Sequence, residues 1–307
     1  MTLVQLHYVI EVAESGSINK AADNLFISQP SLSRAIRSLE DELGFKIFNR
    51  NGKGVTLTDG GTEFLSYARE VYGRYEDMLE KFGGVNVKKK FGVSTQHYSF
   101  AVRAFVNMVK HYDTSEYEFA IRETMTESVM QDVSGMRSEI GILYLSDFNR
   151  KAILKLLDQY ELEFHHLINC GWYVYLCKSH PLAGEKSITF AQLADYPCLS
   201  FEQGDGSSFY LSEEILSTNF YTRVIKANDR ATFLNLMVGL NGYTLCSGIV
   251  CNDLNGDNYL AIPFEQDEDN PTGVMDIGYV VRKNSNLSKM GEEYLYELKT
   301  YLDSVQA

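Results

Sequence analysis

The sequence lacks several features that would assign it to common classes of protein. No stretch reaches about 18 uncharged apolar residues, so we expect no membrane-spanning helix. The first residues meet an acidic side chain at Glu11 and have no basic start before a small-residue cleavage site, so we expect no secretory signal and a cytoplasmic protein. Of the 307 residues, 45% are hydrophobic and 22% are charged. These proportions exclude wholesale disorder and predict two or more folding units.

Motifs typical of enzymes are also missing. There is no G-x-S-x-G nucleophile elbow, no P-loop and no H-E-x-x-H metal motif. The glycine-rich residues 204–208 lack the strand-to-helix pattern of a dinucleotide site, and the pair His165-His166 has no carboxylates at ligand spacing. We therefore predict a protein that is not an enzyme and that holds no metal and no cofactor. Turnover of a metabolite would contradict this prediction.

Cysteine is too scarce and too scattered for a disulfide framework or a zinc site. None of the five residues forms a C-x-x-C pair, and no histidine lies at zinc-like spacing beside them. We expect reduced, mostly buried thiols that behave as small hydrophobic side chains. The five are Cys170, Cys177, Cys198, Cys246 and Cys251.

Basic charge is not in excess overall, but its distribution is uneven. The net charge is −13, and the isoelectric point is near 5.0. Residues 1–90 contain 12 basic and 12 acidic side chains, so all the excess negative charge lies in residues 91–307. An acidic C-terminal part repels phosphate, whereas a neutral N-terminal part can still present a local basic face. Any binding of nucleic acid must therefore be local.

Residues 1–58 read as three short helices followed by a hairpin. Ser17 is a candidate N-cap for the second helix, and Ser28 for the third, with Pro30 in its first turn. Gly44 ends the third helix, after which residues 46–57 form a predicted hairpin. Helices at a tight turn followed by a hairpin predict a winged helix-turn-helix.

Residues 59–88 follow as a long helix whose apolar side chains repeat at spacings of three and four. A narrow seam of this kind favours a paired helix and therefore a dimer. Packing of the helix against its own C-terminal domain is the alternative. The seam residues are Phe64, Ala68, Val71, Tyr75 and Met78.

From Phe91 onward, strand-like and helix-like segments alternate. Alternation of this kind predicts α/β architecture with largely parallel sheets, in which ligand sites lie at the carboxyl ends of strands. The fold class predicted for the whole chain is therefore α/β, with an all-α winged domain at its N-terminus.

The segment from Ser17 to Arg50, SINKAADNLFISQPSLSRAIRSLEDELGFKIFNR, resembles the N-terminal signature of LysR-type transcriptional regulators, and the resemblance continues through residues 55–61. Later segments are also similar to that family: residues 138–142, residues 180–183 (HPLA) and residues 192–197 (QLADYP). Residues 237–247 resemble its later glycine loop, although Leu240 and Ser247 stand where glycine and proline are frequent.

The resemblance implies that the third helix reads DNA. Its N-terminus carries short polar side chains suited to base edges, and Gln29 can pair with adenine. Arg34 and Arg37 share one helix face, although Arg37 could instead pair with Asp41. Five of the six basic residues in positions 1–58 lie between positions 34 and 53. The predicted DNA contacts are Ser28, Gln29, Pro30, Ser31, Ser33, Arg34 and Arg37, with Arg50 and Lys53 on phosphate.

The resemblance also implies a C-terminal effector domain of two α/β lobes, as in periplasmic binding proteins. The first lobe would span residues 89–163 and 267–307, and the second residues 164–266, with a small ligand between them. Polar or aromatic residues that follow strands are the candidates for binding it, although each could be an ordinary cap or turn residue. They are Ser94, Thr95, Gln96, Thr124, Phe201 and Asn228.

The implied function is that of a homo-oligomeric transcription factor controlled by a small molecule of unidentified structure. Paired winged domains imply an operator that is an imperfect palindrome, and RNA polymerase is a possible further partner. A redox-sensing regulator of the same fold is one alternative, but peroxide-sensing members use a cysteine pair after the strand that corresponds to residues 198–201, and residues 202–208 here contain no cysteine. A plain solute-binding protein is the other alternative, and the N-terminal helix-turn-helix argues against it.

Overall fold

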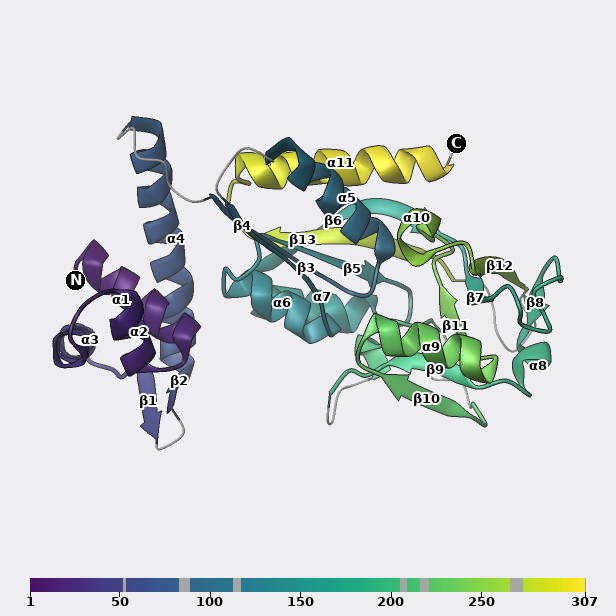
Figure 1. Ribbon diagram of the computed structural model, residues 1–307, viewed down its shortest axis with the longest axis horizontal. Helices are drawn as coiled ribbons and strands as arrows, with labels where there is room; N and C mark the ends of the chain where they lie inside the picture. The colour runs from purple at the N-terminus through teal and green to yellow at the C-terminus, as the bar shows by residue number, and fades with distance from the viewer. Residues whose placement is uncertain are drawn as a thin grey trace. The chain divides into compact units, whose positions relative to one another are not determined.

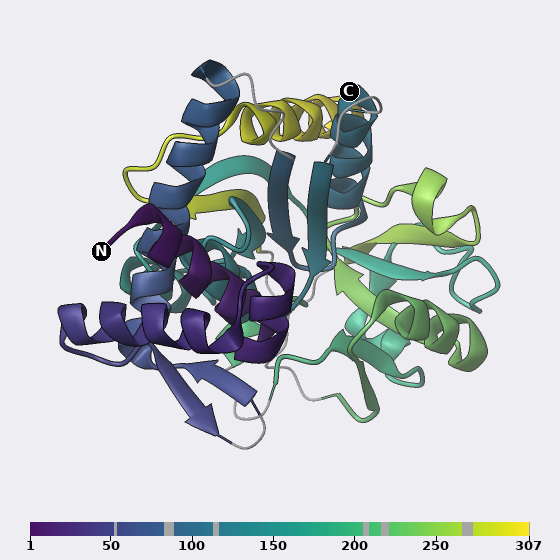
Figure 2. The same cartoon turned by 60° about the vertical axis from the view of Figure 1, so that its left-hand side comes forward.

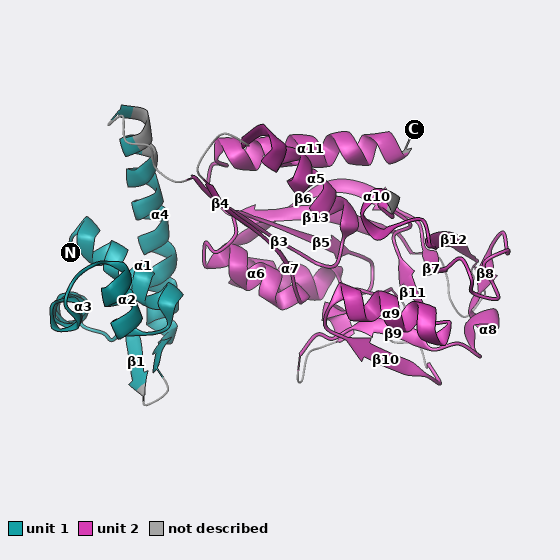
Figure 3. Cartoon of the chain, viewed as in Figure 1, with its two compact units in different colours: residues 1–88 teal, residues 89–307 magenta. Residues whose placement is uncertain are grey.

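The computed structural model describes residues 1–51, 54–82, 89–112, 117–204, 209–215, 221–265 and 273–306. Two compact units make up the chain, residues 1–88 and residues 89–307 (Figures 1 and 3). Lys53 and the end of the predicted linker at residues 83–88 lie outside the described residues. Within the described residues, no helix is long and apolar enough to cross a membrane.

The first unit contains the predicted three helices, the hairpin and a long helix (Figure 2). Its elements are α1 (Leu3–Ser15), α2 (Ile18–Asn24), α3 (Gln29–Leu43), β1 (Phe48–Asn51), β2 (Gly54–Leu57) and α4 (Asp59–Phe82). The predicted caps are confirmed: the Ser17 and Ser28 side chains accept the N–H groups of Lys20 and Ser31, and Gly44 ends α3 with a φ of 79°. A positive φ of this size favours glycine because other residues there suffer a Cβ clash.

A buried carboxylate joins the recognition-type helix α3 to the hairpin. Leu32, Ile36 and Leu39 are fully buried, and Glu40 beside them is 4% exposed. Its Oε1 accepts the backbone N–H groups of Ile47, at 3.0 Å, and Phe48, at 3.2 Å. Because a carboxylate accepts charge-assisted bonds from both groups, it fixes the start of β1 against the end of α3.

The second unit begins with a lobe built on a five-stranded sheet in the order β4-β3-β5-β13-β6. Helices α5 and α11 cover one face, and α6 and α7 cover the other, so the sheet is buried on both sides. The elements are β3 (Lys89–Thr95), α5 (Ser99–Val109), η1 (Lys110–Tyr112), β4 (Tyr117–Glu123), α6 (Thr126–Ser134), β5 (Ile140–Leu145), α7 (Arg150–Gln159), β6 (Leu162–Cys170), β13 (Met275–Arg282) and α11 (Lys289–Gln306).

A second lobe is inserted between β6 and β13, and its sheet has the order β10-β9-β11-β7-β12-β8. Its elements are β7 (Tyr173–Cys177), β8 (Ile188–Thr189), α8 (Phe190–Leu193), β9 (Cys198–Phe201), η2 (Phe209–Leu211), β10 (Val224–Ala227), α9 (Arg230–Leu240), β11 (Tyr243–Cys246), α10 (Asn252–Asn255) and β12 (Tyr259–Glu265). β6 pairs with β13 as far as Cys170, so residues 164–170, which we placed in the second lobe, belong to the sheet of the first.

The prediction of largely parallel sheets is wrong in part, because both sheets are mixed. β3 runs parallel to β4 and β5, and β9 runs parallel to β10 and β11. β13 is antiparallel to β5 and β6, and β7 is antiparallel to β11 and β12. The antiparallel pairs arise where the chain passes from one lobe to the other and returns, since β13 then enters the first sheet in the opposite direction.

Candidate functional site

The N-terminus of α3 presents a row of polar side chains to solvent. Ser28, Gln29, Pro30 and Ser31 are exposed and Ser33 is half-buried. The Gln29 amide donates to the Ser33 hydroxyl at 2.8 Å, and the hydroxyls of Ser28 and Ser31 are also 2.8 Å apart. Ser28 is therefore both a cap and part of an exposed polar surface. These groups are the donors and acceptors that base edges and phosphates require.

Two exposed arginines follow this polar row on α3, and a third lies on β1. Arg34, Arg37 and Arg50 are all exposed. Arg37 makes no ion pair with Asp41 in the described part of the chain, and the Asp41 carboxylate lies 3.9 Å from the Lys46 ammonium instead. The pairing of Arg37 with Asp41 is therefore not seen among the described residues, and contact of Arg37 with DNA stays a prediction.

The predicted seam on α4 divides into a buried and an exposed part. Ala68 is 2% exposed and packs, together with Phe64, in the core of the first unit. The prediction of an intermolecular seam therefore fails for these two residues, since α4 packs first against α1 of its own chain. Val71 and Met78, seven residues apart, are 50% and 51% exposed, and the half-buried Tyr75 lies between them in sequence. Only this part of the seam is free for a second helix.

Three of the predicted effector-binding residues are buried inside the first lobe and hold its parts together. The Ser94 hydroxyl donates to Asp132 at 2.6 Å and lies 2.8 Å from the Ser138 hydroxyl. The Gln96 amide donates to Thr126 at 2.6 Å. Thr95 is fully buried. Ser94 and Thr95 are the last residues of β3 and only Gln96 follows the strand, and α6 packs over this end of it.

Two further predicted residues also lie away from the pocket between the lobes. Thr124 is half-buried and its backbone N–H donates to the Thr95 carbonyl at 2.9 Å. Asn228 is exposed on the second lobe. Of the six candidates, only Phe201 lines the pocket described next, and effector binding by the six stays a prediction.

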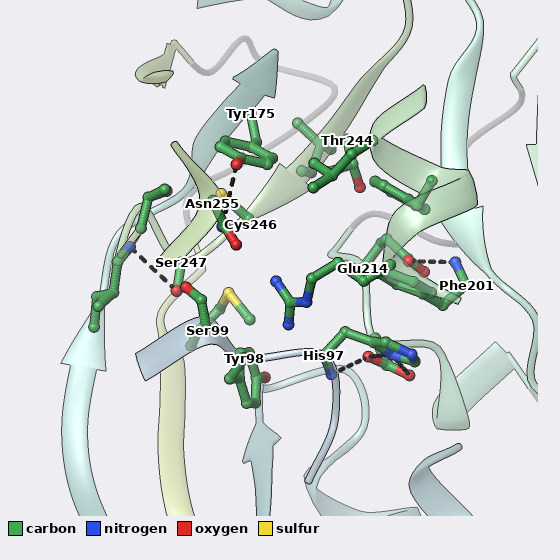
Figure 4. A pocket seen from close by; sticks show the side chains of 18 residues that line it. His97, Tyr98, Ser99, Tyr175, Phe201, Glu214, Thr244, Cys246, Ser247 and Asn255 are labelled. Atoms are coloured by element: carbon green, nitrogen blue, oxygen red, sulfur yellow. Dashed lines mark hydrogen bonds and ion pairs between the residues drawn. The ribbon is translucent and has the colours of Figure 1, made fainter. Parts of the chain in front are cut away.

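The pocket lies between the start of α5 in the first lobe and the β9, α9 and β11 region of the second (Figure 4). Including the open solvent at its mouth, the hollow measures ≈ 680 Å³. Its polar and aromatic lining consists of His97, Tyr98, Ser99, Tyr175, Phe201, Glu213, Glu214, Arg230, Phe233, Thr244, Cys246, Ser247 and Asn255. Aliphatic side chains complete the walls.

An aromatic stack and a close contact between His97 and Glu213 join the two lobes at this pocket. The His97 ring stacks on Phe201 with centroids 3.6 Å apart, and Phe201 stacks on Phe233 at 4.3 Å. The Nδ1 atom of His97 lies 2.9 Å from Glu213, and both side chains are only 6% exposed. The Gln203 side chain connects the lobes as well, because its carbonyl accepts the Thr126 N–H at 3.0 Å.

Glu214 is the most perturbed acid of the pocket. It is 7% exposed, and burial, together with the charge of Glu213, raises its pKa to about 7. Its Oε1 accepts the Phe201 N–H at 2.7 Å and its Oε2 accepts the Ser212 hydroxyl at 2.9 Å. Both donors are neutral, so they compensate only part of the desolvation of the charged form.

The raised pKa predicts that the second unit loses stability as the pH rises. In the unfolded chain Glu214 ionises near its ordinary pKa of 4.5, whereas in the folded chain it holds its proton to about 7. Folding is therefore favoured at low pH, and the contribution of about 3 kcal/mol is lost as the pH rises from 4.5 to 7. Urea unfolding of wild type and Glu214→Gln, followed by the fluorescence of the single tryptophan, Trp172, measures the difference. Identical pH profiles for the two proteins would contradict the prediction.

The sequence analysis did not predict most of the residues that line the pocket, although two of them lie close to predicted residues in the sequence. His97 follows Gln96 directly, and Arg230 lies two residues beyond Asn228. Glu213 and Glu214 lie in an irregular segment, so no periodicity indicates their burial. Two adjacent acidic residues beside the apolar Ile215 are the only trace of this cluster in the sequence.

The cysteines are free thiols, and four of the five are buried, as predicted. Burial raises the pKa of Cys170 and Cys198 to about 12 and that of Cys246 to about 11. Peroxide reacts with the thiolate, so raised pKa values disfavour oxidation. Among the described residues, no group of three or more histidine, cysteine or acidic side chains could hold a metal ion.

Comparison with known proteins identifies both parts of the chain. Residues 3–62 match the family model described as bacterial regulatory helix-turn-helix protein, lysR family, and residues 113–302 match the LysR substrate binding domain. The RuBisCO operon transcriptional regulator of Allochromatium vinosum is 31% identical over 67% of this chain and 66% of its own length. The uncharacterised HTH-type transcriptional regulator YwbI of Bacillus subtilis is 26% identical over 98% of this chain and 97% of its own length.

Solved structures show the same fold. A full-length OxyR variant from Pseudomonas aeruginosa superposes with a TM-score of 0.67 at 19% identity, over 97% of this chain and 98% of that one. CbnR, a LysR family transcriptional regulator, superposes with a TM-score of 0.56 at 18% identity, over 98% of this chain and 99% of that one. At these identities the likeness concerns the architecture alone.

Proposed function

Because the chain belongs to the LysR family of transcriptional regulators, with its helix-turn-helix and substrate-binding domains, we propose that it is a cytoplasmic, non-enzymatic regulator that binds an operator as a homo-oligomer. The observation that carries the DNA-binding part is the exposed polar N-terminus of α3 beside Arg34, in an N-terminal part (residues 1–90) with equal numbers of basic and acidic side chains. The bases are read there, and Arg50 on the hairpin binds phosphate, which adds affinity without sequence preference.

Two copies pair through the exposed part of α4, around Val71 and Met78. A dimer with a twofold axis presents two recognition helices, so its operator is an imperfect palindrome. RNA polymerase, bound beside the operator, is the proposed recipient of the regulatory signal.

The effector binds in the pocket between the lobes. Contacts between the lobes surround that pocket, including the His97–Glu213 pair and the bond from the Tyr144 hydroxyl to the Ser212 carbonyl at 3.1 Å. A ligand that prefers one degree of lobe closure shifts the population of that state. Through the oligomer, the shift alters the spacing of the winged domains.

Fluorescence anisotropy with the DNA upstream of the protein's own gene, against a scrambled duplex at two salt concentrations, tests the proposal. We expect specific binding that weakens with salt, because phosphate contacts release counterions. The proposal would be contradicted if the upstream DNA and the scrambled duplex bound equally well at both salt concentrations, and if the same held for neighbouring promoters.

Arg34→Ala is expected to weaken operator binding by about 1–3 kcal/mol, with little change on the scrambled duplex, if the guanidinium reads a base. Arg34→Lys is the matched variant, since it keeps the charge and loses the bidentate geometry. Specificity lost in both variants assigns Arg34 to a base. Near-normal binding by Arg34→Lys would assign it to phosphate instead.

A further inference from the structure

The ionisable side chains that line the pocket differ in the partners that they already have. The Arg230 guanidinium is bound by both carboxylate oxygens of Glu123, with one of the two bonds at 3.1 Å. Glu213 is held by the His97 ring and by the Gln203 amide, at 2.9 Å each. The Arg230 guanidinium is therefore already paired with a carboxylate, and the Glu213 carboxylate already has two hydrogen-bonding partners.

Glu214 differs, because its side chain accepts hydrogen bonds from the neutral donors of Phe201 and Ser212. Glu214 interacts electrostatically with five other titratable groups: Glu213, Tyr98, Tyr144, Cys198 and Tyr221. Burial raises the pKa of each of the three tyrosines and of Cys198, so all four are neutral near pH 7. In the described part of the chain, Glu214 is thus a buried acid without a cationic partner.

The remaining lining suits an apolar body with a positive end. Tyr175 lies across the pocket from Tyr98 and His97 (Figure 4), and the electron-rich faces of aromatic rings attract cations. Thr244 also lines the pocket and is 7% exposed. Its hydroxyl makes no hydrogen bond within the described part of the chain, so its oxygen can accept one from a ligand.

We propose that this pocket binds a small organic amine in its protonated form, with the ammonium group paired with the Glu214 carboxylate and the apolar body between the aromatic walls. The inference rests on the proposed function and specifies the chemical class of its effector. A carboxylate ligand of the same size would meet Glu213 and Glu214, and it would have to displace Glu123 to reach Arg230. A buried acid without a cation gains a partner only from a cationic ligand.

Isothermal titration calorimetry on the full chain at pH 8 tests the proposal with three probes of matched size: 2-phenylethylamine, phenylacetate and 2-phenylethanol. We expect the amine to bind at least tenfold more tightly than the acid and the alcohol. We also expect its affinity to fall by at least fivefold at pH 6, where Glu214 must release a proton before it can pair.

Glu214→Gln is expected to remove the preference for the amine. Glu202→Gln is the matched control, because Glu202 lies in the same segment but is exposed, and it should behave as wild type. Tighter binding of phenylacetate, equal binding of all three probes, or no binding of the amine would overturn the proposal. So would an undiminished preference in Glu214→Gln. These titrations contain no DNA, so failure of the amine to bind is distinguishable from failure of the protein to bind an operator.

Discussion

Val71→Glu on α4 is expected to convert the oligomer into monomers and to lower the affinity for the full operator more than 100-fold. Val71 is 50% exposed on the free part of the seam. A carboxylate there would lie opposite its own copy across a twofold axis, in a contact that excludes water. Monomers bind each half-site separately and lose the gain in effective concentration that a dimer provides. Sedimentation or light scattering measures the mass, and anisotropy measures the affinity.

The control for this variant is Thr62→Glu. Nine residues separate the two positions on α4, which places Thr62 on the opposite face of the helix. Thr62 is exposed, so the substitution adds the same charge without touching the seam. Its mass in solution should match the wild type. An unchanged mass for Val71→Glu and for Met78→Glu would show that the copies pair through another surface.

The first unit could be predicted closely because its structure depends on local rules. Ser17, Ser28 and Gly44 act within one turn of the residues they cap, so short-range sequence is sufficient to place α2 and α3. The seam on α4 was predicted less well. Spacing shows which residues share a helix face but not what covers that face, and α1 covers Ala68.

The pocket could be predicted only in outline, because contacts between distant segments determine its lining. Ser94 and Gln96 were placed correctly at the end of β3, yet they bond to Asp132 and Thr126, more than 29 residues away. Glu213 is brought to His97 across 116 residues. Sequence patterns locate the ends of strands, but they do not show which irregular segment packs against them.

Gly61→Ala is expected to destabilise the first unit by about 3 kcal/mol or more, a larger cost than that of most single substitutions. A Cβ at this position would lie 2.0 Å from the Ile47 carbonyl oxygen, which is backbone and cannot rotate away. The Gly61 N–H also donates to the Thr58 hydroxyl at 2.9 Å. The first turn of α4 must therefore move away from the hairpin. Hydrogen exchange of the amides in residues 1–82 reports this unit separately from the second.

Gly73→Ala is the matched variant on the same helix, because nothing lies within 4 Å of a Cβ built there. Alanine in an open helical position is worth up to about 1 kcal/mol over glycine, so this variant should protect α4 rather than expose it. The same substitution thus acts with opposite signs at two positions twelve residues apart. If Gly61→Ala and Gly73→Ala both stabilise the first unit, α4 can move away from the hairpin at little cost. The hairpin would then not be held rigidly beside α3. Operator affinity then decides whether that rigidity matters, since a hairpin that shifts would carry Arg50 away from the phosphate contact that we propose for it.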